Sequence, residues 1–226
     1  MSLTKARGAP RAPTTLLIVR HAETADNVEV RLSGWTDADL TARGEAQVNL
    51  LADHFNRAHR HAAALYSSPL TRARRTADAI GTLTGHGPIL LDDLREMHFG
   101  ELEGRPFEEI KQIYGHLMRA NESAEVEDFA WPNGESRLGF RRRVQRVMNR
   151  IAIAHPGQAV GVITHGGVIS TFLTIVHGEP SGSWRKWGVD NASLTEVLWD
   201  GAHETGTLLR HGDAAHLSQL AAEESG

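Results

Sequence analysis

Apolar residues cluster in short runs along the chain, and these runs predict β-strands. Thr14–Arg20 and Ala159–Thr164 each contain consecutive apolar residues instead of an alternation. This pattern is typical of strands that are buried on both faces of a parallel sheet. Ala63–Ser67 and Leu194–Asp200 are also predicted as strands, and Ile89–Leu91 and Thr207–Arg210 are two further candidates.

Segments with apolar residues at helical spacing lie between these runs. The predicted helices are Thr41–His59, Pro69–Leu83, Ser136–His155 and Gly166–Val176. Thr41 is the expected N-cap of the first helix, and Ser68 is the expected cap of the second, with Pro69 at its first helical position. Strands that alternate with helices predict a three-layer α/β/α fold with a mostly parallel central sheet.

The composition is that of an ordinary globular protein. The chain has 226 residues, of which 40% are hydrophobic and 23% are charged. We expect a single domain over residues 14–212, with a flexible N-terminal tail over 1–13 and a C-terminal tail over 213–226. The chain has no cysteine, which excludes disulfides, thiolate metal sites and a cysteine nucleophile.

Charge and hydropathy indicate which partners to expect. The net charge of −4 provides no overall attraction to nucleic acid or to an anionic membrane. The sequence has neither a signal-peptide pattern nor an apolar run of 18 residues, so we expect a cytoplasmic protein. Any site that binds an anion must therefore be a local feature.

Such a local feature follows the two most apolar strands. His21 comes directly after the first strand and His165 directly after the later one, and ligands of open α/β sheets bind outside the carboxyl ends of the strands. Arg20 and Arg72 are expected at the same edge, beside a helix N-terminus. Two arginines suit a phosphate dianion, and a neutral imidazole is a competent nucleophile. Each residue alone would more often be structural or a surface charge, so the prediction depends on their combination.

Five sequence blocks carry a family resemblance. In order, they are RHAET (20–24), SSPLTRARRTA (67–77), LREMHFGELEG (94–104), PNGES (132–136) and THGG (164–167). Together they closely resemble the histidine phosphatase superfamily, also called the phosphoglycerate-mutase-like family. The resemblance spans about residues 14–200 and implies that family's mostly parallel sheet, with no metal and no cofactor.

The resemblance also implies a role for each matching residue. His21 would be the nucleophile that is phosphorylated, and Glu96 would be the acid that protonates the leaving oxygen. Arg20, Arg72 and His165 would hold the phosphoryl group and complete the catalytic set. Further substrate contacts would come from Asn27, from Ser33 and Gly34, and from Gly166 after the second histidine. Many members have glycine where this chain has Ala22, and we expect no loss of activity from that difference.

The family contains hydrolases and mutases, which differ in whether water or the bound product accepts the phosphoryl group. The stretch from Arg105 to Trp131 is short and acidic here, and an acidic lid is a poor clamp for a bisphosphate. We therefore predict a phosphatase that hydrolyses small phosphate monoesters. A cofactor-dependent phosphoglycerate mutase is the alternative, and a non-catalytic binder of a phosphorylated ligand is a third hypothesis.

Three other features have ordinary structural interpretations. The arginines of Ser136–His155 are expected on the solvated face of an amphipathic helix, not in a nucleic-acid site. His54, His59 and His61 lack the spacing of metal ligands, so no metal site is predicted. Trp184 and Trp187 are expected to pack in the core or in a homodimer contact.

Overall fold

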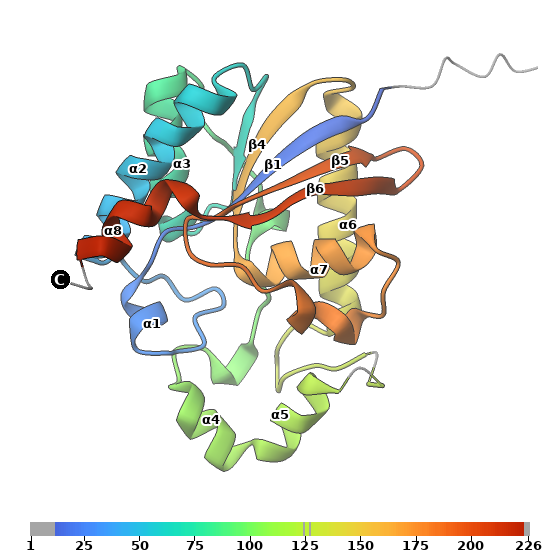
Figure 1. Cartoon of the computed structure of the whole chain (residues 1–226). Coiled ribbons are helices and arrows are strands. Elements are labelled where there is room, and N and C mark those ends of the chain that lie inside the picture. The colour runs from blue at the N-terminus through green and yellow to red at the C-terminus, as the bar shows by residue number, and fades with distance from the viewer. Residues whose placement is uncertain (1–11, 124, 127, 224–226) are drawn as a thin grey trace, which may run out of the picture.

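A six-stranded sheet forms the centre of the molecule (Figure 1). The computed structural model describes residues 12–123, 125–126 and 128–223. The strands are β1 (Thr14–Arg20), β2 (Leu65–Ser67), β3 (Ile89–Leu90), β4 (Ala159–Thr164), β5 (Leu194–Asp200) and β6 (Thr205–Asp213). Their order is β3-β2-β4-β1-β5-β6. The first four strands in that order are parallel, whereas β5 and β6 are each antiparallel to the preceding strand. The predicted mostly parallel sheet is confirmed.

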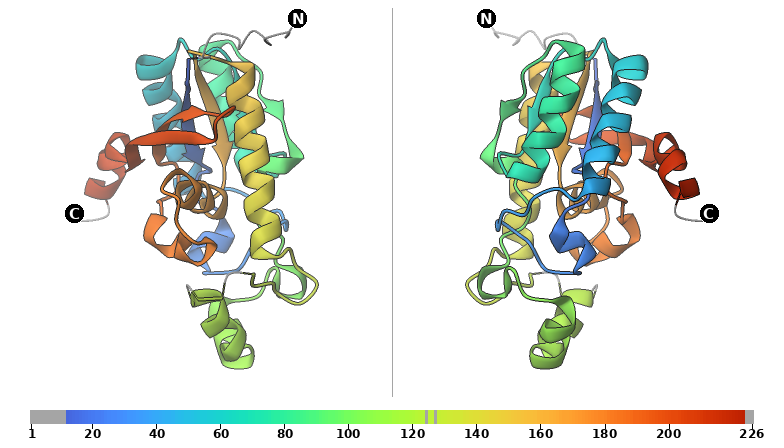
Figure 2. Two further views of the ribbon diagram at one scale, coloured as in Figure 1. Left: turned by 90° about the vertical axis from the view of Figure 1, so that its right-hand side faces the viewer. Right: turned by 90° about the vertical axis from the view of Figure 1, so that its left-hand side faces the viewer.

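Helices cover both faces of this sheet (Figure 2). One layer contains α2 (Ala42–His59) and α3 (Thr71–Thr84), and the other contains α6 (Arg137–Ala154) and α7 (Gly166–Val176). Leu17 and Val19 of β1 pack with α2 and α3, whereas Leu16 and Ile18 pack with α6 and α7. Alternate side chains of β1 therefore enter different cores, which explains why the strand is apolar at consecutive positions.

A small helical unit extends beyond the end of the sheet where β1 ends (Figure 1). It contains α4 (Phe107–Ile113) and α5 (Gly115–Glu122), and we call it the α4–α5 unit. It has its own apolar cluster, formed by Leu102, Ile110, Met118, Phe129 and Trp131. The remaining short elements are α1 (Ala25–Val28), η1 (Asp92–Leu94), η2 (Gly100–Leu102), η3 (Ser181–Trp187), η4 (Ala215–Leu217) and α8 (Ser218–Glu223).

Two helix starts test the capping predictions. Thr41 caps α2 as predicted, with its hydroxyl accepting the Gly44 N–H at 2.9 Å. The prediction for the next helix is wrong, because α3 begins at Thr71 with Leu70 as an N-cap that makes no side-chain hydrogen bond. Ser68 and Pro69 precede the helix, and the Ser68 hydroxyl contacts His165 instead.

The C-terminal end also differs from the expected tail over 213–226. Strand β6 continues to Asp213, and η4 and α8 follow it. The His216 ring stacks on His54 of α2 with a centroid distance of 4.9 Å, and Leu217 packs against the α2–α3 core. These contacts hold η4 against the domain. Most of the expected N-terminal tail, residues 1–11, lies outside the described residues.

Over the described part of the chain, none of the helices is long and apolar enough to cross a membrane.

Candidate active site

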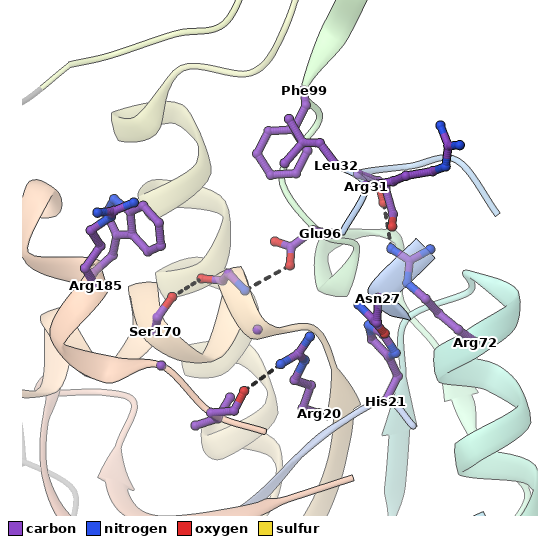
Figure 3. A pocket seen from close by; sticks show the side chains of 17 residues that line it. Arg20, His21, Asn27, Arg31, Leu32, Arg72, Glu96, Phe99, Ser170 and Arg185 are labelled. Atoms are coloured by element: carbon purple, nitrogen blue, oxygen red, sulfur yellow. Dashed lines mark hydrogen bonds between the residues drawn. The ribbon is translucent and has the colours of Figure 1, made fainter. Parts of the chain in front are cut away.

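A cleft of about 530 Å³ opens where β1 and β4 end (Figure 3). Eight of the nine residues predicted for the site line it, namely Arg20, His21, Asn27, Ser33, Gly34, Arg72, Glu96 and Gly166. The ninth, His165, is fully buried, and its ring centroid is 5.2 Å from that of His21. The structure therefore brings together the residues that the sequence analysis selected.

The sheet itself places the two histidines side by side. Strands β1 and β4 are neighbours, and Arg20 pairs with Thr164 in their register. The His21 N–H continues this ladder by donating to the Thr164 carbonyl at 2.9 Å. Each histidine is the first residue after its strand, so main-chain pairing fixes how close the two rings lie.

The surroundings of His21 determine which of its ring nitrogens could act as a nucleophile. Its Nδ1 lies 2.7 Å from the Ala22 carbonyl, and because a carbonyl oxygen can only accept, Nδ1 carries the ring proton. The Nε2 lone pair is then available for attack. Burial, and after it the positive charges of Arg72 and Arg20, hold the pKa of His21 well below the usual value, although the Ala22 hydrogen bond opposes this. The ring is therefore neutral, as a nucleophile must be.

Main-chain carbonyls orient the two arginines. Arg20 donates from Nη1 to the Val189 carbonyl at 2.6 Å, and Arg72 donates to the carbonyls of Thr36 and Gly34 at 2.9 and 2.7 Å. Burial lowers the pKa of both guanidinium groups, and the negative charge of Glu96 opposes that effect. Both groups remain charged, because an arginine stays protonated in a protein.

Three buried nitrogens of this site have no hydrogen-bond partner among the described residues. They are Nε of Arg20, Nε of Arg72 and Nδ1 of His165. Buried polar atoms are nearly always paired in folded proteins, so three unpaired atoms in one place require an explanation. The two arginine atoms are charge-assisted donors, and an anion with several oxygens would satisfy them.

Glu96 is held at the edge of the cleft by two main-chain donors. Its Oε2 accepts the Gly167 N–H at 2.9 Å, and its Oε1 accepts the Met97 N–H at 2.8 Å. The absence of a side chain at position 167 permits this approach, because a Cβ there would lie 2.2 Å from Oε1. The carboxyl group thus has a fixed position beside the N-terminus of α7.

Arg143 of α6 holds the main chain that carries Glu96. It donates to the carbonyls of Asp93, Arg95 and Glu96 at 2.8–3.0 Å and forms an ion pair with Glu135 at 2.6 Å. Arg137 is buried as well, with 4% of its surface exposed. The expectation that the α6 arginines all lie on a solvated face is therefore wrong for these two, because polar groups of the chain pack against that side of the helix.

Of the four remaining predicted contacts, Asn27, Ser33 and Gly34 lie near the arginines, and Gly166 is the first residue of α7. The Oδ1 of Asn27 accepts the Thr24 N–H at 3.1 Å and an N–H of the Asn191 side chain at 3.0 Å, so Asn27 also organises the loop after β1. Gly34 has a φ of 51°, which favours glycine, and its carbonyl orients Arg72. Ser33 lines the same wall of the cleft.

The outer wall of the cleft was not predicted from the sequence. This wall contains Arg31, Leu32, Phe99, Ser170, Trp184 and Arg185. Ser170 and Arg185 lie on the opposite side of the cleft from His21 and Arg72 (Figure 3). Trp184 lines the cleft, whereas Trp187 stacks on His177 and packs against the core. The spacing of the two tryptophans predicts a shared helical segment but gives no sign that one of them faces a ligand.

The described residues contain no cluster of three or more His, Cys, Asp or Glu side chains that could hold a metal ion.

Comparison with known proteins identifies the family. Residues 16–216 match the profile described as histidine phosphatase superfamily, branch 1. The chain is 31% identical over 207 residues to putative phosphoserine phosphatase 2 of Hydrogenobacter thermophilus, with 91% of this chain and 98% of that protein covered. It is 30% identical over 212 residues to phosphoglycerate mutase-like protein 4 of Arabidopsis thaliana, with 93% and 90% covered.

A solved structure supports the same assignment. The mycobacterial glucosyl-3-phosphoglycerate phosphatase in complex with VO3 superimposes with a TM-score of 0.79 at 26% identity. The match covers 88% of this chain and 99% of that one. Two of these three similar proteins are named phosphatases, which supports a phosphoric monoester hydrolase. The chain belongs to branch 1 of the histidine phosphatase superfamily.

Proposed function

We propose that this chain is a metal-independent phosphatase that transfers the phosphoryl group of a small monoester to His21 and then to water. The observation that carries this proposal is the set of unpaired buried nitrogens on Arg20, Arg72 and His165, which lie around a neutral His21. A phosphoryl group would supply the oxygens that these atoms lack.

In the first step, Nε2 of His21 attacks phosphorus and the bond from phosphorus to the ester oxygen breaks. Glu96, in its protonated form, gives a proton to the departing oxygen, because an alkoxide leaves poorly without one. Arg20 and Arg72 stabilise the charge on the phosphoryl oxygens during transfer. The NH₂ group of Asn27, whose oxygen is already hydrogen-bonded, would contact the same oxygens.

In the second step, water attacks the phosphohistidine and the nitrogen–phosphorus bond breaks. Glu96, now a carboxylate, takes the proton that the water loses. Inorganic phosphate leaves, and His21 returns to the tautomer that the Ala22 carbonyl maintains. His21 and Glu96 therefore act in both steps, and no cofactor is required.

Water is the preferred acceptor of the phosphoryl group, instead of a bound phosphate ester, because of the α4–α5 unit. This unit carries Glu108, Glu109 and Glu122, and Glu122 already forms an ion pair with Arg185 at 2.8 Å. An acidic group near the opening disfavours a bisphosphate. With 3-phosphoglycerate and 2,3-bisphosphoglycerate as substrates, phosphate release should exceed isomer interconversion. Faster interconversion would instead support the mutase.

The direct test is turnover of p-nitrophenyl phosphate in the presence of EDTA. We expect turnover by the parent, an acid-labile phosphoenzyme after a rapid quench, and neither in His21→Ala. Turnover that survives in His21→Ala would exclude the phosphohistidine mechanism. No turnover of any phosphate monoester, combined with tight phosphate binding, would support the non-catalytic binder.

A cytoplasmic location belongs to the same proposal. So does the absence of nucleic-acid and membrane partners, which the net charge of −4 supports. A homodimer also stays a prediction.

A further inference from the structure

The hydroxyl group of Ser68 contacts the ring of His165 in the buried floor of the site. The distance from Oγ to Nε2 is 2.8 Å, and both residues are completely buried. Ser68 follows β2 and His165 follows β4, and these strands are paired neighbours with Ser67 opposite Ile163. The sheet therefore holds the hydroxyl and the ring in place.

The other ring nitrogen of His165 is one of the unpaired atoms described above. Nδ1 is buried and has no partner among the described residues. The centroid of the His165 ring lies 5.2 Å from that of the His21 ring, which places His165 beside the proposed phosphate position. A neutral imidazole has a single ring proton, so its tautomer decides whether Nδ1 donates or accepts.

The hydrogen bonds of Ser68 favour one tautomer of His165. The Ser68 oxygen accepts the Leu70 N–H at 3.3 Å, and Nε2 of His165 is the only acceptor that the described residues offer to the hydroxyl proton. Nδ1 then carries the ring proton and becomes a donor to an anion. In the opposite tautomer, Nε2–H would donate to Ser68 and the Nδ1 lone pair would face the phosphoryl oxygens, which is repulsive.

The state of the free ring is consistent with this choice. Burial, and then the charge of Arg72, hold the pKa of His165 well below the usual value, so the ring has only one proton.

We propose that Ser68 is a positioning residue that fixes the tautomer of His165, so that Nδ1–H donates to the phosphoryl group carried by His21. This inference rests on the proposed function. Among the described residues, only the Ser68 side chain forms a hydrogen bond with the His165 ring, whereas the Ser67 hydroxyl donates to the Ser68 carbonyl. Ser67 is equally buried and therefore provides a matched control.

The first test reads the tautomer directly and needs no turnover. ¹⁵N NMR of histidine-labelled protein distinguishes protonated from unprotonated ring nitrogens, and the His165→Gln variant assigns the signal among the 13 histidines. We expect Nδ1–H in the parent and in Ser67→Ala, and Nε2–H or a mixture in Ser68→Ala. A parent with Nε2–H would overturn the proposal, even if the phosphatase activity is confirmed.

The second test measures the catalytic consequence. We expect Ser68→Ala to lower kcat for p-nitrophenyl phosphate by roughly 10- to 100-fold, the range found when a metal-bound histidine loses the partner that orients it. KM should change little, because the hydrogen bond to the phosphoryl group strengthens in the transition state. Ser68→Thr, which keeps the hydroxyl, should restore most of kcat, and Ser67→Ala should stay within about twofold of the parent.

The two tests together separate positioning from a general structural role. A drop in kcat without a change of tautomer, or a change of tautomer without a drop in kcat, would contradict the proposal. A parent that shows Nδ1–H but no turnover would instead contradict the proposed function and leave the assignment of Ser68 supported.

Discussion

Replacing Gly167 by alanine should remove the acid of the proposed mechanism without removing Glu96. The new Cβ would lie 2.2 Å from Oε1 of Glu96, 2.9 Å from its Cδ and 3.1 Å from Oε2. These separations are too short for non-bonded atoms, so the carboxyl group must move and the Gly167 N–H bond to it is lost. Alanine is favoured over glycine within a helix by about 1 kcal/mol, so α7 itself should not be destabilised.

The loss of activity expected in Gly167→Ala depends on the leaving group of the substrate. General acid catalysis contributes typically 10²- to 10⁴-fold, which corresponds to about 3–5 kcal/mol in the activation barrier. An alkyl phosphate such as glycerol 3-phosphate needs that proton, and its kcat/KM should fall by roughly this factor. p-Nitrophenolate leaves without a proton, so kcat/KM for its ester should fall much less.

The assay compares both substrates in the same protein preparation. Glu96→Gln should show the same selective loss, and Gly115→Ala should leave both rates unchanged. Gly115 begins α5, and among the described residues only Arg119, whose Nη1 would lie at 3.7 Å, would meet a Cβ placed there. An equal loss for both substrates, or an unchanged rate with the alkyl ester, would refute the role assigned to Glu96.

Two further predictions concern stability. Arg143→Ala should lower the free energy of unfolding by about 3 kcal/mol, because it leaves Glu135 and three main-chain carbonyls without their partner, and urea denaturation measures this change. A change under about 1 kcal/mol would show that water replaces the guanidinium group readily. Stability should also fall with acidification below the usual histidine pKa of about 6.5, because the folded-state pKa values of His21 and His165 are depressed and the unfolded chain binds the protons. Their stabilising contribution is complete above that value and is lost as the pH drops, so the double variant His21→Gln, His165→Gln should show a flatter pH dependence of the urea midpoint, and an unchanged slope would contradict this account.

An element of the fold could be predicted from the sequence where a single local pattern determines its burial or its first residue. The apolar run of β1 predicts burial on both faces, and Thr41 predicts the start of α2. The start of α3 could not be predicted in the same way, because the Ser68 hydroxyl contacts a residue 97 positions away. Local propensity contains no information about that competing partner.

The positions of the two histidines could be predicted for a similar reason. His21 and His165 each follow a strand that the sequence shows clearly, and topology brings parallel strand ends to one edge. The position of Arg143 could not be predicted, because three of its partners are the main-chain carbonyls of Asp93, Arg95 and Glu96, and every residue has such a carbonyl whatever its side chain. The outer wall combines residues from separate loops, from α7 and from η3, so periodicity could not select Trp184 or Phe99.

The pairing of β1 with β4 has a consequence for how this enzyme could be altered. Neighbouring strands lie about 4.8 Å apart, and the rings of the two histidines that follow them are 5.2 Å apart. The spacing of the reacting groups is thus set by a main-chain ladder, whereas the outer wall and the α4–α5 unit lie on segments that this ladder does not constrain. Loop exchange in those segments should change which ester enters while the transfer chemistry is retained, but a single-residue insertion in either strand should abolish transfer for every substrate.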